Sequence, residues 1–221
     1  VITEPSCNGY ADGSINLTFV DGTLPQTVVW QNSNNAFLSN MPDITNLIAG
    51  EYIVSTTCGL TCSPVIDTII VPEPSALIVP GLTSDVSCFG FNDGSSDITV
   101  SALIPLVLST EWTGSNNFTS NLEDINNLPP GMYSVLVTNV NNCFLTRSFE
   151  IKEPDSILPN LTITNVSCNG GNDGTAILTL SGGTGTLTAD WGTANPLALS
   201  VGTYIYTITD GNMCDTSGTV T

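Results

Sequence analysis

Short stretches rich in Val, Ile, Thr and Tyr recur along the chain, and clusters of Gly, Pro, Asn and Asp separate them. Stretches of this length and composition are typical of β-strands joined by turns. Apolar residues do not recur at helical spacing. In the middle of the chain the pattern predicts strands over residues 82–87, 95–101, 107–112, 133–138 and 143–151, with shorter strands between Trp112 and Gly131. The chain is therefore predicted to be all-β.

One pattern occurs three times. It begins with Cys-x-Gly-x-x-Asp-Gly, as CNGYADG from Cys7, CFGFNDG from Cys88 and CNGGNDG from Cys168, at spacings of 88 − 7 = 81 and 168 − 88 = 80 residues. A Trp, a Tyr ending Leu-x-x-Gly-x-Tyr, and a Cys ten residues after that Tyr complete each copy: Trp30, Tyr52 and Cys62; Trp112, Tyr133 and Cys143; Trp191, Tyr204 and Cys214. The third copy is shorter only between its Trp and its Tyr. A period of this length indicates tandem domains of one fold.

The position of the aromatic residues favours one class of domain. A Trp on the third long strand and a Tyr that opens the penultimate strand are the core Trp and the tyrosine corner of an immunoglobulin-like sandwich. We predict three tandem immunoglobulin-like β-sandwich repeats in a rod-like array, with all three Trp residues in the cores and the three Tyr residues at the corners.

The predicted domains are residues 1–74, 75–154 and 155–221, the last being the shortest. The first two end at Glu73-Pro74 and Glu153-Pro154, and further prolines at Pro80 and Pro159 make each link semi-rigid. The sequence stops at Thr221, where the next Glu-Pro pair is due. We therefore expect the chain to be part of a longer array.

Composition excludes several functions. The chain has 2 Lys and Arg against 20 Asp and Glu, a net charge of −18, and no His. Without His, catalytic pairs and metal sites that use imidazole cannot form. Nucleic acid is not an expected partner, because binding a polyanion needs a basic surface and the only cations are Arg147 and Lys152. Apolar stretches such as 102–108 are too short for membrane insertion. We predict no enzyme activity, since the acidic pair Glu123-Asp124 has no counterpart in the third copy.

The combination of Cys-x-Gly-x-x-Asp-Gly, Trp, Leu-x-x-Gly-x-Tyr and the following Cys resembles the SprB repeat, which is found in tandem in large surface adhesins of gliding Bacteroidota. The resemblance covers all three copies. It implies an extracellular, cell-surface protein whose repeats form a long filament or stalk.

Seven cysteines without His or a paired Cys-x-x-Cys motif favour disulfides over zinc. Pairing within each repeat would join Cys7 to Cys62, Cys88 to Cys143 and Cys168 to Cys214, leaving Cys58 over. In an immunoglobulin-like sandwich, however, these positions lie at opposite ends, about 20 Å apart. Head-to-tail repeats favour a second scheme: Cys7–Cys143, Cys88–Cys214, Cys58–Cys62, and Cys168 bonded to a following repeat. Both schemes remain open at this point.

Two kinds of ligand or modification site can be proposed. Asp12, Asp93 and Asp173 are calcium candidates, but Asp-Gly also supplies turn geometry and an Asx hydrogen bond, which we favour because no EF-hand-type loop is present. No other cofactor is expected. The resemblance suggests O-glycosylation at Asp-Ser/Thr-aliphatic sequences, which places the candidates at Thr68 and Ser156.

Three functions compete. The first is a structural shaft of a cell-surface adhesin or filament that presents distal adhesive parts and transmits force, with neighbouring repeats of the same long chain as partners. The second is a loop-based module that binds glycans or proteins, such as surface polysaccharide or the substratum. It is disfavoured because the loops differ between repeats and no exposed aromatic residue is expected to recur. The third is a spacer in a secreted enzyme.

Overall fold

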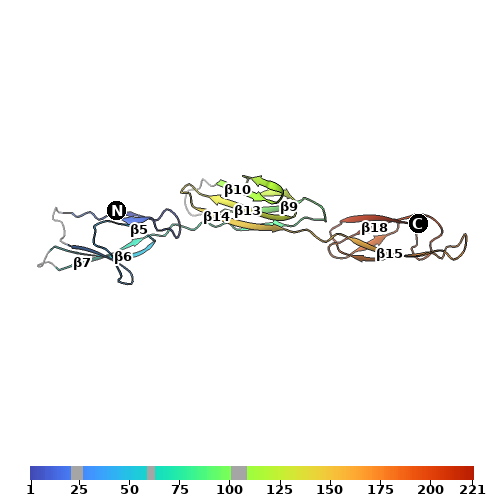
Figure 1. Cartoon of the computed structure of the whole chain (residues 1–221), viewed down its shortest axis with the longest axis horizontal. Coiled ribbons are helices and arrows are strands. Elements are labelled where there is room, and N and C mark those ends of the chain that lie inside the picture. The colour runs from blue at the N-terminus through green and yellow to red at the C-terminus, as the bar shows by residue number, and fades with distance from the viewer. Residues whose placement is uncertain (21–26, 59–62, 101–108) are drawn as a thin grey trace. The chain divides into compact units, whose positions relative to one another are not determined.

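A computed structural model describes residues 1–221 except 21–26, 59–62 and 101–108 (Figure 1). Apart from the short 3-10 turn η1 (Ser115–Asn117), the regular structure of the described ranges is β-strand. Each repeat contributes two sheets, so the all-β prediction and the immunoglobulin-like sandwich prediction are confirmed.

The first repeat has a three-stranded sheet of order β1-β2-β5 and a four-stranded sheet of order β4-β3-β6-β7, with antiparallel pairing. The strands are β1 (Ile2–Thr3), β2 (Gly13–Ile15), β3 (Thr27–Asn32), β4 (Phe37–Ser39), β5 (Ile44–Leu47), β6 (Gly50–Thr57) and β7 (Val65–Val71). Side chains of both sheets meet in one buried cluster, formed by Ile15, Val28, Trp30, Ile44, Leu47, Tyr52, Val54 and Val71. This shared core is what makes the two sheets a sandwich.

The second repeat has the sheets β12-β9-β8 and β11-β10-β13-β14. Its strands are β8 (Gly81–Ser84), β9 (Gly94–Ile98), β10 (Ser109–Gly114), β11 (Phe118–Ser120), β12 (Ile125–Leu128), β13 (Gly131–Thr138) and β14 (Phe144–Ile151). Buried and more exposed residues alternate along β13, as expected for a strand with one face toward a core: Tyr133, Val135 and Val137 are buried while the residues between them are not. The five predicted long strands are therefore present, although the first ends at Ser84 rather than at residue 87 and the second ends at Ile98 rather than at residue 101. Residues 101, 107 and 108 of the predicted strands lie outside the described residues.

The third repeat is smaller. Its sheets are β15-β16 and β17-β18-β19, formed by β15 (Leu158–Thr164), β16 (Thr175–Ser181), β17 (Thr188–Asp190), β18 (Tyr204–Thr209) and β19 (Asp215–Val220). Where the other repeats have β5 and β12, it has a single bridge between Gly174 and Leu199. Its buried cluster contains Ala176, Leu199 and Val220. The shortened stretch before Tyr204 has thus removed a strand from the smaller sheet.

The predicted tyrosine corners form in every repeat, because the hydroxyl of each Tyr donates to the carbonyl oxygen four residues earlier. The distances are 2.8 Å from Tyr52 to Ile48, 2.8 Å from Tyr133 to Pro129 and 3.0 Å from Tyr204 to Ser200.

The Trp prediction is correct for two repeats and needs correction in the third. Trp30 and Trp112 are 0% and 1% exposed, and their indole N–H groups donate to the carbonyl oxygens of Met41 and Leu122. Trp191 packs against the third core but is only partly buried. The stretch that covers the other two indoles is the one shortened in this repeat.

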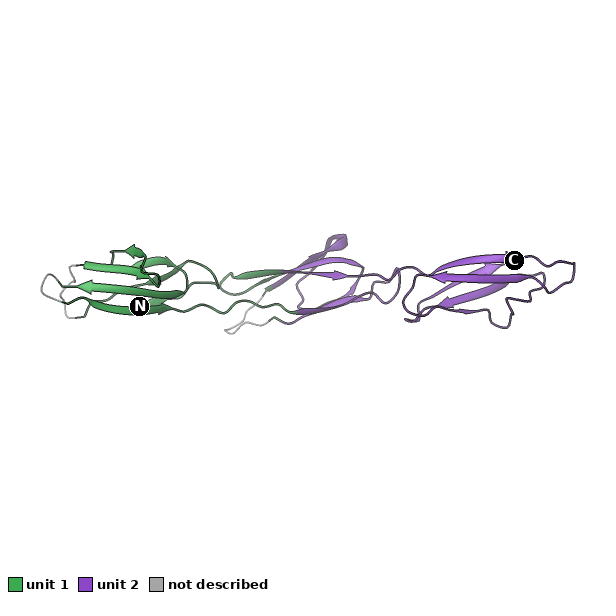
Figure 2. Ribbon diagram, turned by 90° about the horizontal axis from the view of Figure 1, so that it is seen from below, with its two compact units in different colours: residues 1–80, 100–109, 136–146 green, residues 81–99, 110–135, 147–221 purple. Residues whose placement is uncertain are grey.

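The described residues divide into two compact units (Figure 2). One contains residues 1–80, 100–109 and 136–146, and the other contains residues 81–99, 110–135 and 147–221. The division passes through β10, β13 and β14, so the part of the second repeat that carries Cys143 groups with the first repeat. The boundaries 1–74, 75–154 and 155–221 follow the sequence period and stay a prediction.

Candidate functional site: the cysteine loops

The Cys-x-Gly-x-x-Asp-Gly segment forms the same loop in all three repeats, between β1 and β2, β8 and β9, and β15 and β16. The glycine after the cysteine has a left-handed backbone in each copy, with φ of +76° at Gly9, +78° at Gly90 and +80° at Gly170. Each loop is closed by a bond from the backbone N–H three residues after the cysteine to the cysteine carbonyl oxygen, of 2.9 to 3.1 Å. The glycine is needed because other residues are strained at this φ.

The aspartate of the loop bonds to the serine before the cysteine. Asp93 accepts from the backbone N–H of Ser87 at 2.9 Å and from its hydroxyl at 2.5 Å, and Asp12 accepts the same pair from Ser6 at 2.8 and 2.5 Å. The N–H of Ser167 donates to Asp173 at 3.0 Å. Bonding to the serine side chain and backbone lowers the pKa of all three carboxyls.

These bonds engage the carboxylates that were calcium candidates. Within the described ranges, His, Cys, Asp and Glu side chains form no group of three or more that could hold a metal ion. In this structure Asp12, Asp93 and Asp173 therefore stabilise the loop through hydrogen bonds from the serine before the cysteine. In the sequence, this serine can be recognised from the Ser-Cys pair that occurs in all three copies.

The glycine that follows each aspartate has a different role from the predicted turn geometry. None of Gly13, Gly94 and Gly174 has a positive φ. A Cβ at these positions would instead lie 2.9, 3.0 and 3.0 Å from the carbonyl oxygens of Leu47, Leu128 and Leu199, respectively. These leucines begin the Leu-x-x-Gly-x-Tyr segments, so the two repeated motifs pack against each other.

The loop cysteines bond as the head-to-tail scheme predicts. Cys7 is joined to Cys143 and Cys88 to Cys214, each pair with Cα atoms 5.6 Å apart. Each bond links one repeat to the next, and pairing of Cys88 with Cys143 within a repeat does not occur. Cys7 and Cys88 are buried, with exposures of 4% and 7%.

The turn that carries the second cysteine of each pair is held by a polar side chain four residues before it. Asn139 accepts from the backbone N–H groups of Asn141 and Cys143, each at 2.9 Å. Asp210 accepts from Asn212 at 2.8 Å, Cys214 at 2.9 Å and Thr184 at 2.7 Å, which lowers its pKa. The turn that carries each of these cysteines is therefore fixed by hydrogen bonds of its own as well as by the disulfide.

The remaining cysteine predictions have different outcomes. Cys58 occupies the position of Asn139 and Asp210 and is disulfide-bonded. Its predicted partner, Cys62, lies outside the described residues. Cys168 carries a free, exposed thiol.

The glycosylation candidates differ in accessibility. Thr68 is exposed on the edge strand β7, whereas Ser156 is partly buried beside the second disulfide.

The expectation that no exposed aromatic residue recurs is wrong. Tyr10 and Phe91 occupy equivalent loop positions and are 46% and 53% exposed. Tyr10 lines a pocket with Cys7 and Cys143, and Phe91 lines one with Cys88 and Cys214. The third loop has Gly171 at this position, so the exposed aromatic residue occurs in only two of the three repeats and is not part of the shared sequence pattern.

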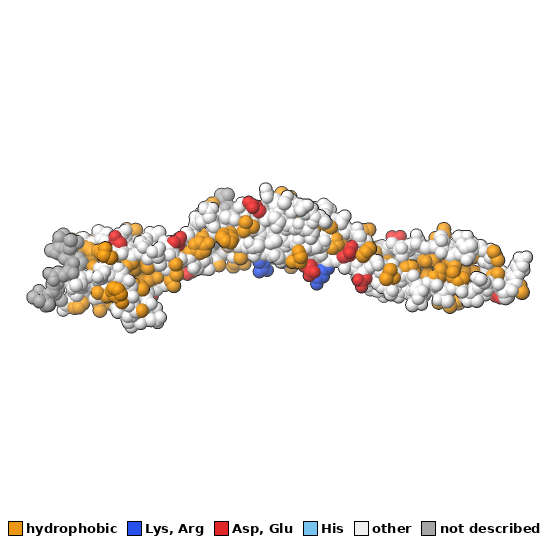
Figure 3. Space-filling view, viewed as in Figure 1, with side chains coloured by type: hydrophobic (Ala, Val, Ile, Leu, Met, Phe, Trp, Pro, Cys, Tyr) orange, Lys and Arg blue, Asp and Glu red, His pale blue; other side chains and the backbone are white. Residues whose placement is uncertain are grey.

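Elsewhere the visible surface carries few charged groups, and uncharged polar and hydrophobic side chains cover most of the face drawn in Figure 3. In the part of the chain that the structure describes, no helix has the length and apolarity required to cross a membrane.

Comparison with known proteins supports the family assignment. Residues 160–194, in the third repeat, match the family model of the SprB repeat. No curated protein matches the chain.

Three solved structures match the chain at low sequence identity, each with a TM-score below 0.5. The three N-terminal domains of the bacteriophage RB49 Highly Immunogenic Outer Capsid protein (Hoc) are 16% identical with a TM-score of 0.43, over 100% of this chain and 80% of that one. The full ectodomain (Ig1–Ig3) of mouse nectin-like molecule 4 is 12% identical with a TM-score of 0.34, over 97% and 93% of the two chains. The amphioxus IgVJ-C2 molecule is 16% identical with a TM-score of 0.29, over 65% and 97%.

Proposed function

We propose that this chain, whose third repeat is an SprB repeat, is a segment of the shaft of a long cell-surface adhesin or extracellular filament that presents distal adhesive parts and transmits force. The observation that carries the proposal is the pair of disulfides that join each repeat to its neighbour. Disulfides persist in oxidising, extracellular surroundings, which agrees with this location. The shaft needs no cofactor and no enzyme activity.

The disulfides give the chain a short covalent path for tension. The shortest path from Cys7 to Cys214 crosses both bonds and only the 143 − 88 = 55 residues between Cys88 and Cys143. Including the residues outside the bonds, the fully unfolded chain could extend to about 240 Å, at roughly 3.5 Å per residue, against about 770 Å without the bonds. Most of the chain is thus shielded from load.

The test is single-molecule pulling between residues 1 and 221 of the whole chain. We expect the oxidised protein to stop extending at about 240 Å, and the reduced protein to reach about 770 Å. Extension of the oxidised chain to its full length would contradict the force-bearing role. A variant with Cys168→Ser is the matched control, because it removes a thiol that takes no part in this path.

Cys168 is the expected attachment point for a following repeat. Its loop has the backbone of the Cys7 and Cys88 loops, and those two cysteines are used in this way. In both existing junctions the incoming sulfur also lies 3.2 Å from the carbonyl oxygen of the serine before the loop cysteine, Ser6 or Ser87. Ser167 would supply the equivalent oxygen.

The exposed aromatic residues keep binding as a second candidate function. Tyr10 and Phe91 lie in pockets beside the disulfides, where an aromatic ring offers a stacking surface for a sugar. Binding of the chain to an array of surface polysaccharides, abolished by Tyr10→Ala together with Phe91→Ala, would favour the binding module. If the chain binds no surface polysaccharide and the oxidised protein stops extending at about 240 Å, the shaft function is favoured.

A further inference from the structure

Each of the two inter-repeat disulfides lies beside a pocket, and the two pockets are built from the same positions of the repeat. The first has a volume of about 220 Å³ and the second of about 430 Å³. Both contain the loop cysteine, the aromatic residue three positions after it, the start of the linker and the turn of the second cysteine. Every lining residue of the first pocket has its counterpart in the lining of the second, so the two can be compared position by position.

The two pockets differ in charge. The lining of the first contains no acidic residue, whereas that of the second contains three. Asp155, Asp210 and Asp215 occupy the positions that in the first pocket belong to Ser75, Asn139 and Phe144, respectively. Of the described residues, no Lys or Arg lines either pocket. The negative charge of the second pocket is therefore not balanced from within its lining.

Two of these three carboxylates are accessible to a ligand. Asp210 is only 6% exposed, and its oxygens already accept hydrogen bonds from three backbone N–H groups. Asp155 and Asp215 are exposed, and within the described ranges neither side chain accepts a hydrogen bond. Their charges are thus open to a ligand and are not engaged in holding the fold.

The second pocket also offers apolar surface that water can reach. Phe89 and Phe91 are 56% and 53% exposed, and Met213 is 85% exposed. An aromatic ring attracts a cation to its face, and a nearby carboxylate attracts the same cation by Coulomb interaction. Half-exposed rings and unbalanced carboxylates in one pocket therefore favour a positively charged ligand.

The lining further favours one kind of cation. A primary ammonium group is compact and strongly hydrated, and apolar side chains cannot replace its water. A quaternary ammonium group donates no hydrogen bond and carries its charge beneath methyl groups, which pack well on aromatic rings and thioethers. Phe89, Phe91 and Met213 supply surfaces of this type, while Asp155 and Asp215 supply the opposite charge.

We propose that the pocket between the second and third repeats binds a small quaternary ammonium compound of the choline type, and that the pocket beside the first disulfide does not. The net charge of −18 supports the proposal, because a strongly negative protein raises the concentration of cations at its surface. The inference goes beyond the shaft function and does not depend on it. It also differs from stacking of a sugar on Tyr10 and Phe91, which would use both pockets.

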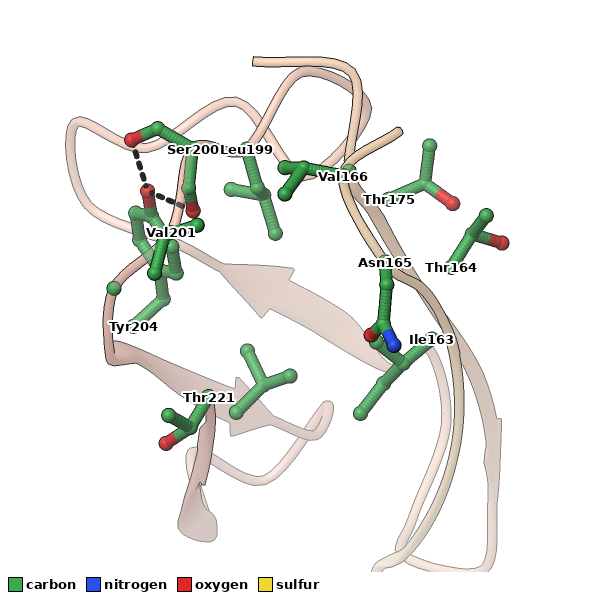
Figure 4. A pocket seen from close by; sticks show the side chains of 13 residues that line it. Ile163, Thr164, Asn165, Val166, Thr175, Leu199, Ser200, Val201, Tyr204 and Thr221 are labelled. Atoms are coloured by element: carbon green, nitrogen blue, oxygen red, sulfur yellow. Dashed lines mark hydrogen bonds between the residues drawn. The ribbon is translucent and has the colours of Figure 1, made fainter. Parts of the chain in front are cut away.

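A third pocket provides a neutral comparison. It lies in the third repeat, has a volume of about 180 Å³, and is lined by residues such as Val166, Leu199 and Tyr204 (Figure 4). The hydroxyl of Tyr204 already donates to the carbonyl oxygen of Ser200. No Asp, Glu, Lys or Arg belongs to the described lining of this pocket. It supplies no side-chain charge to a cation, and we expect no choline there.

The test is a titration of the whole oxidised chain with choline, followed by NMR of isotope-labelled methionine methyl groups. The chain has 3 methionines, which makes each resonance a separate probe. Met213 lines the pocket, whereas Met41 and Met132 are exposed but do not line it. We expect the Met213 resonance to shift until the site is saturated and the other two to stay in place. The neutral alcohol in which carbon replaces the choline nitrogen should bind at least about tenfold more weakly.

Two double variants locate the charge. Asp155→Asn together with Asp215→Asn should weaken choline binding at least about tenfold. Asp97→Asn together with Glu111→Gln is the matched control, because it removes two charges from exposed positions of the second repeat that do not line the pocket. This control should bind choline like the unchanged protein. Unshifted Met41 and Met132 resonances would establish that each variant is folded.

Substitution of the rings tests the aromatic contribution. Phe91→Leu should weaken choline binding, whereas Tyr10→Leu, at the equivalent position of the first pocket, should leave it unchanged. Equal affinity for choline and the neutral alcohol, or equal choline affinity of the two double variants, would overturn the proposal. None of these outcomes alters the limited extension of the oxidised chain under force, so the shaft function is tested separately.

Discussion

Gly94 opens β9 directly against the carbonyl oxygen of Leu128, so close that a Cβ on Gly94 would lie 3.0 Å from that oxygen. The same Cβ would also lie 2.5 Å from the Cγ2 atom of Ile151. A backbone oxygen cannot turn away as a flexible side chain can. We therefore expect Gly94→Ala to lower the free energy of unfolding by about 2 kcal/mol, measured by denaturant titration.

The control for this substitution is Gly90→Ala. A Cβ at Gly90 meets nothing within 4 Å, but its φ of +78° is unfavourable for alanine. The cost should be about 1 kcal/mol from backbone conformation alone. A loss for Gly94→Ala that is no larger than that for Gly90→Ala would show that close packing against Leu128 and Ile151 is not what requires glycine at position 94.

Ser96 is a buried polar residue at an otherwise apolar position. It is 1% exposed, and its hydroxyl has no hydrogen-bond partner in the described structure. The equivalent residues of the other repeats are Ile15 and Ala176, which are both buried. Because an unpaired buried hydroxyl is costly, Ser96→Ala should raise the free energy of unfolding by about 1 kcal/mol. Ser95→Ala, at the half-buried neighbouring position, should change it little, and equal effects of the two would argue against an orphaned hydroxyl.

Much of this fold follows from repetition in the sequence, but local differences between repeats do not. The Trp, Tyr and Cys landmarks predicted the cores, the corners and the inter-repeat bonds because each depends on a position shared by the repeats. The partial exposure of Trp191 depends instead on a covering stretch that this repeat lacks.

The sequence pattern also does not predict the hydrogen bonds that Glu73 and Glu153 accept from the cysteine loops, for another reason. Each joins residues more than sixty positions apart, Gly9 to Glu73 and Gly90 to Glu153, and in sequence the Glu-Pro pairs resemble simple linkers. Only the fold brings the end of the last strand beside the first loop.

The loop aspartates should make the protein sensitive to acid. Asp93 has a pKa lowered from its ordinary value of 3.8 by its bonds to Ser87. As the pH falls, the unfolded chain therefore takes up its proton first. The stability that this group contributes is complete above the unfolded pKa and is lost as the pH falls through the lower folded pKa. Thermal unfolding between pH 6 and 2 should show a declining midpoint.

Substitution separates this effect from the general charge of the protein. Asp93→Asn should flatten the decline, because the amide does not titrate. Asp97→Asn removes a charge from an exposed position on β9 and should leave the slope nearly unchanged. Equal slopes for the two variants would mean that net charge, rather than the Ser87 bonds, governs the acid response.

The bond between Cys7 and Cys143 should contribute strongly to stability, since it closes a separation of 136 residues. In the chain-entropy model a loop of this length is worth about 5 kcal/mol, and native strain would reduce that value. Cys7→Ser together with Cys143→Ser should therefore lower the unfolding temperature measured by calorimetry. Cys168→Ser removes a free, exposed thiol and should not. Non-reducing peptide mapping completes the test, because recovery of Cys88 joined to Cys143 would place the bonds within repeats and remove the basis for force transmission between them.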